Sequence, residues 1–309
     1  MSNAPILITG GAGFIGSHLA DALLARGQHV RILDDLSTGK RENLRLDDER
    51  LELRVGDVAD AATLEAAVAG CAAVVHLAAV ASVQASVEDP VGTHRANFIG
   101  TLNLCEAMRK AGIKRVVYAS SAAVYGANGQ GQAIDEELPK APLTPYAADK
   151  LAGEYYFDFY RREHGLEPAI FRFFNIYGPR QDPSSPYSGV ISIFTERARR
   201  KTPITVFGDG EQTRDFVYVA DLVDILVQAL EASAVTAGAV NVGRGETISL
   251  NGLLAEIGQV LGGLPEVTHG AARAGDIRHS RADNSRLRER FDFSRPTAMG
   301  AGLAALLRD

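Results

Sequence analysis

The sequence predicts an α/β protein: a Rossmann-type doubly wound parallel sheet, followed by a smaller, mixed α/β C-terminal lobe. Through the first half of the chain, short apolar runs alternate with amphipathic segments, as in a parallel sheet covered by helices on both faces. Glycines gather in "TGGAGFIG" (9–16), between the first apolar run and the first helical segment. After residue 175 the alternation weakens, and "YGPRQDPSSPYSG" (177–189) is rich in structure breakers. We place the start of the second lobe there.

Composition limits the classes of protein that fit. The chain has 309 residues, of which 46% are apolar, and a formal net charge of −6. This charge argues against nucleic acid or an anionic membrane as the main partner. The two cysteines, Cys71 and Cys105, lie in apolar contexts and are expected to be free thiols, with no disulfide and no metal site. With no apolar run of about 20 residues and no signal-peptide pattern, we expect a cytoplasmic protein.

The elements of the first half follow from the spacing of apolar residues. Ile15, Leu19 and Leu23 recur at helical spacing, and Gly27 ends that helix after Arg26. Further helical patterns cover about 60–69 and 93–111. The predicted buried strands are 5–10, 29–34, 51–57, 72–79 and 115–120.

The second half adds a long helix and the smaller lobe. Thr144 can cap a helix from Tyr146 to about Arg162, with Pro145 in its first turn. A strand at 168–175 follows, and a helix and strand within 216–243 return to the first domain. Helices near 249–261 and 297–308 complete the second lobe. The predicted domains are therefore 1–174 with about 216–243, and about 175–215 with 244–309.

The glycine cluster has the features of a dinucleotide-binding turn. Gly10, Gly13 and Gly16 permit a tight turn and let the backbone approach a pyrophosphate at a helix N-terminus. Asp34 and Asp35 end the second predicted strand, where a carboxylate accepts hydrogen bonds from a ribose diol and repels a 2′-phosphate. This combination predicts NAD. Lys40 and Arg41 lie close by and leave NADP as an alternative.

Other residues at the ends of the first strands are expected to contact the same cofactor. Asp57 and Val58 close the third strand and are placed to meet the adenine. The complete predicted cofactor set is Gly10, Gly13, Phe14, Ile15, Gly16, Asp34, Asp35, Ser37, Thr38, Gly39, Asp57, Val58, Leu77, Ala78, Ala79, Asn97, Tyr146 and Lys150.

The segment "YAADK" contains a pair typical of acid–base chemistry. Tyr146 and Lys150 are four residues apart and share one face of the predicted helix. A lysine ammonium beside a tyrosine stabilises the phenolate and lowers the tyrosine pKa toward the operating pH. Ser120 and Ser121, at the end of the strand 115–120, can supply a hydroxyl to the reacting oxygen.

These motifs together resemble the extended short-chain dehydrogenase/reductase family. The resemblance rests on TGGAGFIG, Asp34, Asn97, Ser121 and Tyr146 with Lys150, and continues through "FRFFNIYGP" (171–179) and "GDGEQTRDFVYVADL" (208–222). Members of this family act on nucleotide-activated sugars. The resemblance implies that NAD oxidises the sugar at C4, with Tyr146 as base, Lys150 on the nicotinamide ribose and Ser121 at the reacting oxygen.

Two alanines narrow the reaction. In "SSAAVYG" (120–126), Ala122 and Ala123 stand where the family's 4,6-dehydratases carry an Asp-Glu or Ser-Glu pair and its UDP-xylose synthases keep a glutamate. Alanine transfers no proton. A 4-epimerase needs none there, because its ketone only turns over and is reduced on the other face. The resemblance is therefore to UDP-sugar 4-epimerases, including short bacterial ones of exopolysaccharide clusters.

The same resemblance implies a site for the sugar nucleotide. Asn175 contacts the nucleotide, 204–207 line the uracil, Arg214 and Arg273 bind the pyrophosphate, and Asp276 contacts the ribose. The complete predicted substrate set is Ser82, Gln84, Ser121, Ala122, Tyr146, Asn175, Val190, Thr205, Val206, Phe207, Arg214, Arg273, Asp276 and Ser280.

Ser280 predicts which sugar is preferred. Galactose-specific bacterial epimerases have tyrosine at this position, where the ring crowds a substituent on C2. Serine leaves space for an acetamido group, so we expect UDP-GlcNAc and UDP-GalNAc as the preferred pair, with UDP-Glc and UDP-Gal turned over less well.

Several alternatives remain at this stage. A UDP-glucose or UDP-glucuronate 4-epimerase is compatible with the alanines, whereas Ala123 argues against a UDP-glucuronate decarboxylase or a 4,6-dehydratase. A nucleotide-sensing regulator would have lost Tyr146 and Lys150, which are intact. The resemblance also implies a homodimer through a four-helix bundle of 93–111 and 146–162, where Phe157, Phe159 and Tyr160 are candidate interface residues or internal packing.

Overall fold

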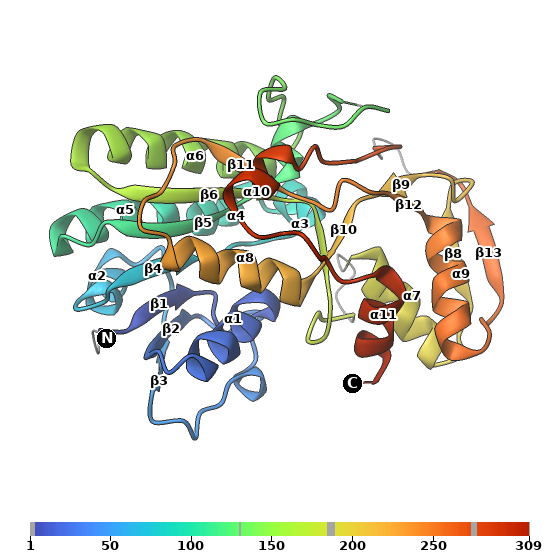
Figure 1. Ribbon diagram of the computed structural model, residues 1–309, viewed down its shortest axis with the longest axis horizontal. Helices are drawn as coiled ribbons and strands as arrows, with labels where there is room; N and C mark the ends of the chain where they lie inside the picture. Colours follow the sequence, from blue (N-terminus) through green and yellow to red (C-terminus); the bar gives the residue numbers. More distant parts are fainter. Residues whose placement is uncertain (1–3, 130, 184–188, 273–276, 309) are drawn as a thin grey trace. The chain divides into compact units, whose positions relative to one another are not determined.

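The computed structural model describes residues 4–129, 131–183, 189–272 and 277–308 (Figure 1). Its internal contacts divide the chain into two compact units. The first comprises Met1–Gly126, Pro142–Arg172 and Val223–Val240, and the second Ala127–Ala141, Phe173–Leu222 and Asn241–Asp309. No helix among the described residues is long and apolar enough to cross a membrane.

The first unit is built on a seven-stranded sheet in the order β11-β6-β5-β4-β1-β2-β3. The strand pairs from β3 through β5 are parallel, which confirms the predicted doubly wound sheet. The strands are β1 (Ile6–Thr9), β2 (Val30–Asp34), β3 (Leu51–Val55), β4 (Ala73–His76), β5 (Arg115–Ser121), β6 (Glu167–Phe173) and β11 (Ala239–Val242). Leu7, Val74 and Val116, from β1, β4 and β5, are fully buried in its core.

Helices cover this sheet, as the apolar spacing predicts. They are α1 (Phe14–Ala25), α2 (Ala61–Val68), α5 (Gly100–Ala111), α6 (Pro145–His164) and α8 (Val219–Glu231) (Figure 1). Helix α5 packs against both α2 and α6. On α6, the Thr144 hydroxyl accepts a hydrogen bond from the Ala147 amide at 3.3 Å, so the predicted N-cap is confirmed. Cys71 and Cys105 are buried free thiols, also as predicted.

The helix predicted at 93–111 is interrupted. The chain forms α4 (Pro90–His94), then one π-helical turn, η2 (Arg95–Ile99), and only then α5. A π-turn inserts one extra residue into a helix and redirects the side chains around it, which apolar spacing alone does not reveal. A short preceding helix, α3 (Val83–Glu88), was not predicted either.

The second unit has its own core and three two-stranded sheets. These pair β7 (Asn175–Tyr177) with β10 (Phe216–Tyr218), β9 (Thr213–Arg214) with β12 (Ile248–Ser249), and β8 (Ile204–Phe207) with β13 (Val267–Gly270). Its helices are α7 (Val190–Arg199), α9 (Leu250–Leu261), α10 (Ser285–Arg290) and α11 (Met299–Arg308). Phe194, Leu253 and Leu303 are buried in its core.

Two chain segments group differently from the predicted domains. Residues 127–141 belong to the second unit because Ile134 exchanges backbone hydrogen bonds with Arg281 and Asp283, each 2.8 Å long. Residues 216–222 also belong there, because β10 pairs with β7 and Asp221 accepts hydrogen bonds from Thr297. The predicted strand at 168–175 likewise ends at Phe173, and Asn175 starts β7. These are long-range pairings with no local signal.

Candidate active site

The glycine turn lies between β1 and α1. At Gly10 and Gly16 its backbone has no room for a side chain. Gly10 has φ +69°, and a Cβ there would lie 2.7 Å from the Ala78 amide nitrogen. A Cβ on Gly16 would collide with the Gly10 carbonyl oxygen. At Gly13 a Cβ would meet only that same oxygen, at 3.3 Å. This open backbone at the N-terminus of α1 fits a dinucleotide pyrophosphate.

The carboxylate of Asp34 ends β2 beside this turn. Its oxygens accept hydrogen bonds from the Ala12 and Leu36 amides, both at 2.9 Å. Burial raises the pKa of Asp34, and the two amide hydrogen bonds oppose that rise. The bonds hold the carboxylate in one orientation and leave each oxygen a second lone pair for a ribose hydroxyl. Asp35 is exposed instead and binds the amide and hydroxyl of Ser37.

Side chains from η2 and α5, which both follow β4, hold the loop after β3. Asp57 pairs with Arg95 of the π-turn at 2.9 Å, and the Asn103 side chain donates to the Ala59 carbonyl at 3.1 Å. Val58 is buried against Gly100. The predicted adenine loop is therefore fixed by side chains from η2 and α5.

The side chain of Asn97, in the π-turn, forms hydrogen bonds with both the amide and the carbonyl of Val80. Its side chain accepts from the Val80 amide at 2.7 Å and donates to the Val80 carbonyl at 3.1 Å. This pairing fixes the loop after β4, which carries Leu77, Ala78 and Ala79. Within the described residues, Asn97 therefore orients the predicted cofactor loop through Val80.

Tyr146, Lys150 and Ser121 come together at the end of β5, as their positions in the sequence predict. The Ser121 side chain lies close enough to the Tyr146 hydroxyl to lower its pKa. The Lys150 ammonium donates to the Ala119 carbonyl at 2.7 Å and lies 5.9 Å from the centre of the Tyr146 ring. The three side chains thus form one constellation in the first unit.

The pKa values in this constellation are set mainly by burial. Burial lowers the pKa of Lys150 to about 8, and the Asp149 charge opposes this. Burial also raises the pKa of Tyr146, while the hydrogen bond with Ser121 lowers it. The protein alone therefore leaves Tyr146 protonated at neutral pH. A cation bound beside it, such as an oxidised nicotinamide, would favour the phenolate.

Ala122 and Ala123 lie in a 3₁₀ turn, η3 (Ala122–Tyr125), directly after Ser121. The Ser121 hydroxyl accepts the Ala123 amide at 3.2 Å, so the serine both caps this turn and reaches Tyr146. Both alanines are partly exposed. The turn carries no group that transfers protons at these two positions.

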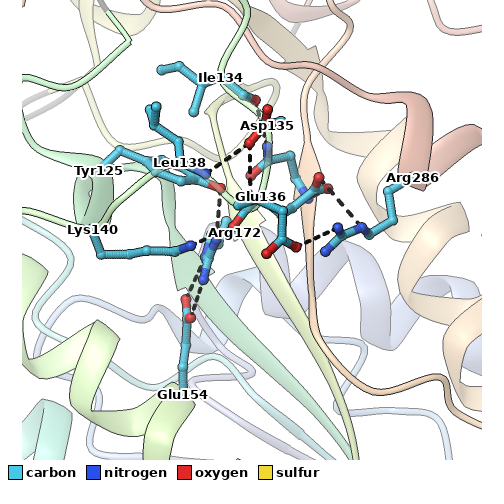
Figure 2. A network of polar contacts seen from close by, with 11 residues as sticks. Tyr125, Ile134, Asp135, Glu136, Leu138, Lys140, Glu154, Arg172 and Arg286 are labelled. Atoms are coloured by element: carbon cyan, nitrogen blue, oxygen red, sulfur yellow. Dashed lines mark hydrogen bonds and ion pairs between the residues drawn. The ribbon is translucent and has the colours of Figure 1, made fainter.

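A buried polar network supports the turn (Figure 2). Arg172 of β6 donates to both carboxylate oxygens of Glu154, at 2.9 and 2.6 Å, and to the Tyr125 hydroxyl at 2.8 Å. Ser120, next to Ser121, donates to Glu154 as well. Glu154 and Arg172 were not predicted from the sequence. The only signal was the position of Glu154 four residues after Lys150 on α6.

The predicted sugar contacts in the first unit have structural partners of their own. Ser82 is the N-cap of α3, where its hydroxyl accepts the Ala85 amide at 3.0 Å. Gln84 is exposed and donates to Glu88 of the same helix at 3.1 Å. Their contact with a substrate stays a prediction.

In the second unit, β8 presents alternate faces. Val206 is fully buried in the core, so only its backbone is available to a ligand. Thr205 is partly exposed and Phe207 is 40% exposed. This alternation follows from strand geometry, and it leaves Thr205 and Phe207 as the β8 side chains able to meet a base.

Arg214 and Ser280 lie on neighbouring segments of the second unit. The Ser280 amide donates to the Thr213 carbonyl at 3.3 Å, and the Arg214 guanidinium donates to the Thr213 and Arg278 carbonyls. Both side chains are partly exposed. Val190 begins α7. Arg273 and Asp276 fall outside the described residues.

Asp215 positions these segments and was not predicted. Its carboxylate accepts the amides of Arg244, Gly245 and Ala282 at 2.7, 2.9 and 3.1 Å, and burial raises its pKa to about 6. Its carbonyl accepts the Asn175 side chain at 3.1 Å. Asp215 thereby fixes the backbone around Arg214, Asn175 and the segment after Ser280.

Comparison with known proteins agrees with this geometry. Residues 6–243 match the NAD dependent epimerase/dehydratase family. The chain is 41% identical over 302 residues to a UDP-glucose 4-epimerase of Mycolicibacterium smegmatis, covering 96% of each protein. A solved UDP-N-acetylglucosamine 4-epimerase of Methanobrevibacter ruminantium, in complex with UDP-N-acetylmuramic acid, has a TM-score of 0.94 at 37% identity, covering 100% of this chain and 98% of that one. A Thermus thermophilus UDP-glucose 4-epimerase in complex with NAD has a TM-score of 0.89 at 37% identity, covering 98% of each chain.

These matches identify the class of protein. The chain belongs to the NAD dependent epimerase/dehydratase family. Within that family it stands with the UDP-sugar 4-epimerases, which makes it an isomerase that uses NAD, as the motifs predict.

Proposed function

We propose that this protein interconverts UDP-GlcNAc and UDP-GalNAc by inverting C4 of the sugar. The observation that carries the proposal is the constellation of Tyr146, Lys150 and Ser121 beside a turn whose first two positions are Ala122 and Ala123. It supports proton transfer at one hydroxyl and no second acid–base step.

The roles of the side chains follow from their contacts. Tyr146 takes the C4 hydroxyl proton and returns it after the sugar has turned over. The Lys150 ammonium stabilises the charge that develops on the Tyr146 oxygen, and the Ser121 hydroxyl orients the reacting oxygen. The glycine turn and Asp34 would hold NAD, which would accept the hydride from C4 and return it to the other face of the ketone. The reaction is redox-neutral, so we expect NAD to stay bound through each turnover.

The alanines argue against the family's other reactions. Removing the C5 proton in a dehydratase requires an additional base, and the UDP-xylose synthases retain a glutamate in this turn. Ala122 and Ala123 have no such group. Their small side chains also leave room for a sugar to rotate.

The acetamido preference rests on Ser280. The partly exposed serine follows His279, which bridges to Thr213 of β9 beside Arg214. We assign Phe207, Arg214 and Asn175 to the nucleotide, with Arg273 and Asp276 as further predicted contacts. A small side chain at 280 allows a bulky group on C2, whereas tyrosine would fill that space.

The test compares turnover of both UDP-sugar pairs by wild-type protein and Ser280→Tyr. We expect wild type to prefer the acetamido pair and the variant to lose that turnover by about 10-fold or more, because overfilling a packed site costs about 1–3 kcal/mol. UDP-Glc turnover should persist in the variant. Unchanged turnover of the acetamido pair by Ser280→Tyr would contradict the proposed role of Ser280. A wild-type preference for UDP-Glc or UDP-glucuronate would identify the alternative substrate.

A second variant tests the catalytic assignment. Tyr146→Phe should lower kcat by about 10²–10⁴, the usual contribution of a general base, while NAD remains bound. Tyr155→Phe, an exposed position on the same helix, is the matched control and should retain activity. Wild-type activity in Tyr146→Phe would refute the assignment.

A further inference from the structure

Asp149, directly before Lys150 on α6, is a buried carboxylate with one partner. The residue is 6% exposed. Its Oδ1 lies 2.7 Å from Nδ1 of His94, the last residue of α4. Its Oδ2 is buried and meets no hydrogen-bonding group in the part of the chain that the structure describes. A buried carboxylate oxygen left unpaired is costly, so its retention points to a role.

Asp149 directly precedes Lys150 on α6, and its charge acts on that lysine although the two side chains face different elements. Consecutive helical residues are about 100° apart around the axis. Lys150 faces β5, where it binds the Ala119 carbonyl, while Asp149 faces α4. The π-turn after His94 inserts one residue, so that His94 reaches α6 while Asn97 still reaches Val80. His94 also stacks on Phe98, with ring centres 5.1 Å apart.

Of the two buried carboxylates described near Lys150 on α6, Asp149 pairs with a histidine and not with an arginine or lysine. Glu154, one turn along α6, is neutralised by Arg172. From β4, His76 is fully buried and uncharged at neutral pH, since burial lowers its pKa to about 3. From β5 and α6, the rings of Tyr118 and Tyr146 lie 5.3 and 5.9 Å from the Lys150 ammonium. On the other side, His94 faces Asp149, while Arg95 pairs with Asp57.

We propose that Asp149, oriented by His94, is a positioning residue that keeps the buried Lys150 ammonium charged for proton transfer at Tyr146. The inference rests on the function proposed above for Lys150. Asp149 touches neither Tyr146 nor Ser121 in the described contacts and acts through the lysine. His94 holds the carboxylate in place.

Burial lowers the pKa of Lys150 to about 8, and the Asp149 charge raises it against this trend. Removing the charge therefore lowers the Lys150 pKa further. Lys150 then loses its proton at lower pH, and activity that needs the ammonium declines at lower pH.

Asp149→Asn tests this inference, because asparagine keeps the size and the hydrogen-bonding capacity toward His94. Asp158→Asn, at a partly exposed position on the same helix that pairs with Arg161, is the matched control. We expect the alkaline limb of the kcat profile to move down by about half a pH unit or more in Asp149→Asn and to stay in place in the control. His94→Asn should give a smaller shift than Asp149→Asn.

A measurement that does not depend on activity separates this inference from the proposed function. The chain has six lysines, and Lys150 is the one classed as buried. NMR titration of protein labelled at lysine Cε, with Lys150→Met to assign the signal, reports its ionisation directly. A downward shift in folded Asp149→Asn supports the inference even if wild type lacks epimerase activity. Superimposable Lys150 titrations in wild type and Asp149→Asn would overturn it.

Discussion

Glu154 and Arg172 form a buried ion pair that joins α6 to β6 (Figure 2). Two hydrogen bonds, of 2.6 and 2.9 Å, link the two side chains, and Tyr125 and Ser120 satisfy further polar atoms. Each residue alone would leave a buried charge.

Breaking this pair should destabilise the protein. Glu154→Ala leaves Arg172 buried without its counter-charge, and we expect a loss of about 3–5 kcal/mol in the free energy of unfolding, measured with urea. The double variant Glu154→Leu/Arg172→Met should recover much of that loss, because no charge is left unpaired. Glu163→Ala, exposed on the same helix, is the control. A single variant as stable as wild type would contradict this role.

The glycine turn offers a matched pair of substitutions. Gly10→Ala places a Cβ 2.7 Å from the Ala78 amide nitrogen at φ +69°, so the turn must shift and NAD binding should fall. Gly27→Ala has a similar φ of +76° but meets nothing within 4 Å. It should cost only about 1 kcal/mol of stability and retain NAD. Chromatography of the nucleotide released on unfolding measures the NAD content of each variant. Equal NAD content in the two variants would count against the predicted NAD site at the glycine turn.

His76 should make stability depend on pH. Burial lowers its folded pKa to about 3, from 6.5, so the unfolded state takes up the proton first. Stability is therefore lost as pH falls from 6.5 toward 3, by about 1.4 kcal/mol per pH unit from this group. Urea unfolding of His76→Asn at pH 7.5 and 5.5 should show a smaller pH dependence than wild type. Exposed His269→Asn should behave as wild type; equal slopes in all three proteins would refute the assignment.

The predicted dimer can be tested on α6. Phe157 and Tyr160 are buried in the core of the first unit, so of the three aromatics named from the sequence only Phe159 is exposed, at 43%. Tyr155 joins it at 64%. If α6 forms a homodimer interface, Tyr155→Glu with Phe159→Glu should convert a dimer into a monomer in light scattering. Val55→Glu, 53% exposed on β3, is the control; an unchanged dimer in the α6 variant would place the interface elsewhere.

Local patterns carried the predictions of position that agree with the structure. The glycine turn and the Thr144 cap depend on residues within one turn of each other, and Tyr146 and Lys150 on helical spacing. Asp34 at the end of β2 follows from strand order. Each needed only the period of a helix or strand and the parallel arrangement of the sheet.

The missed residues share a different property. Glu154 pairs with Arg172, 18 residues away in the sequence, and His94 pairs with Asp149, 55 residues away. Asp215 gathers amides from residues 244, 245 and 282. No spacing rule connects such partners, because the intervening chain is free to fold in many ways.

By itself, the sequence determined the class of fold, the cofactor and the kind of reaction. Those depend on residue types at short spacings: glycines before a helix, tyrosine and lysine one turn apart, and alanines where an acid would be needed. Only the tertiary structure decided which side chains surround Lys150 and Ser121. Buried charges are stabilised by partners that lie far away in the sequence. Only the folded chain brings those partners within hydrogen-bonding distance.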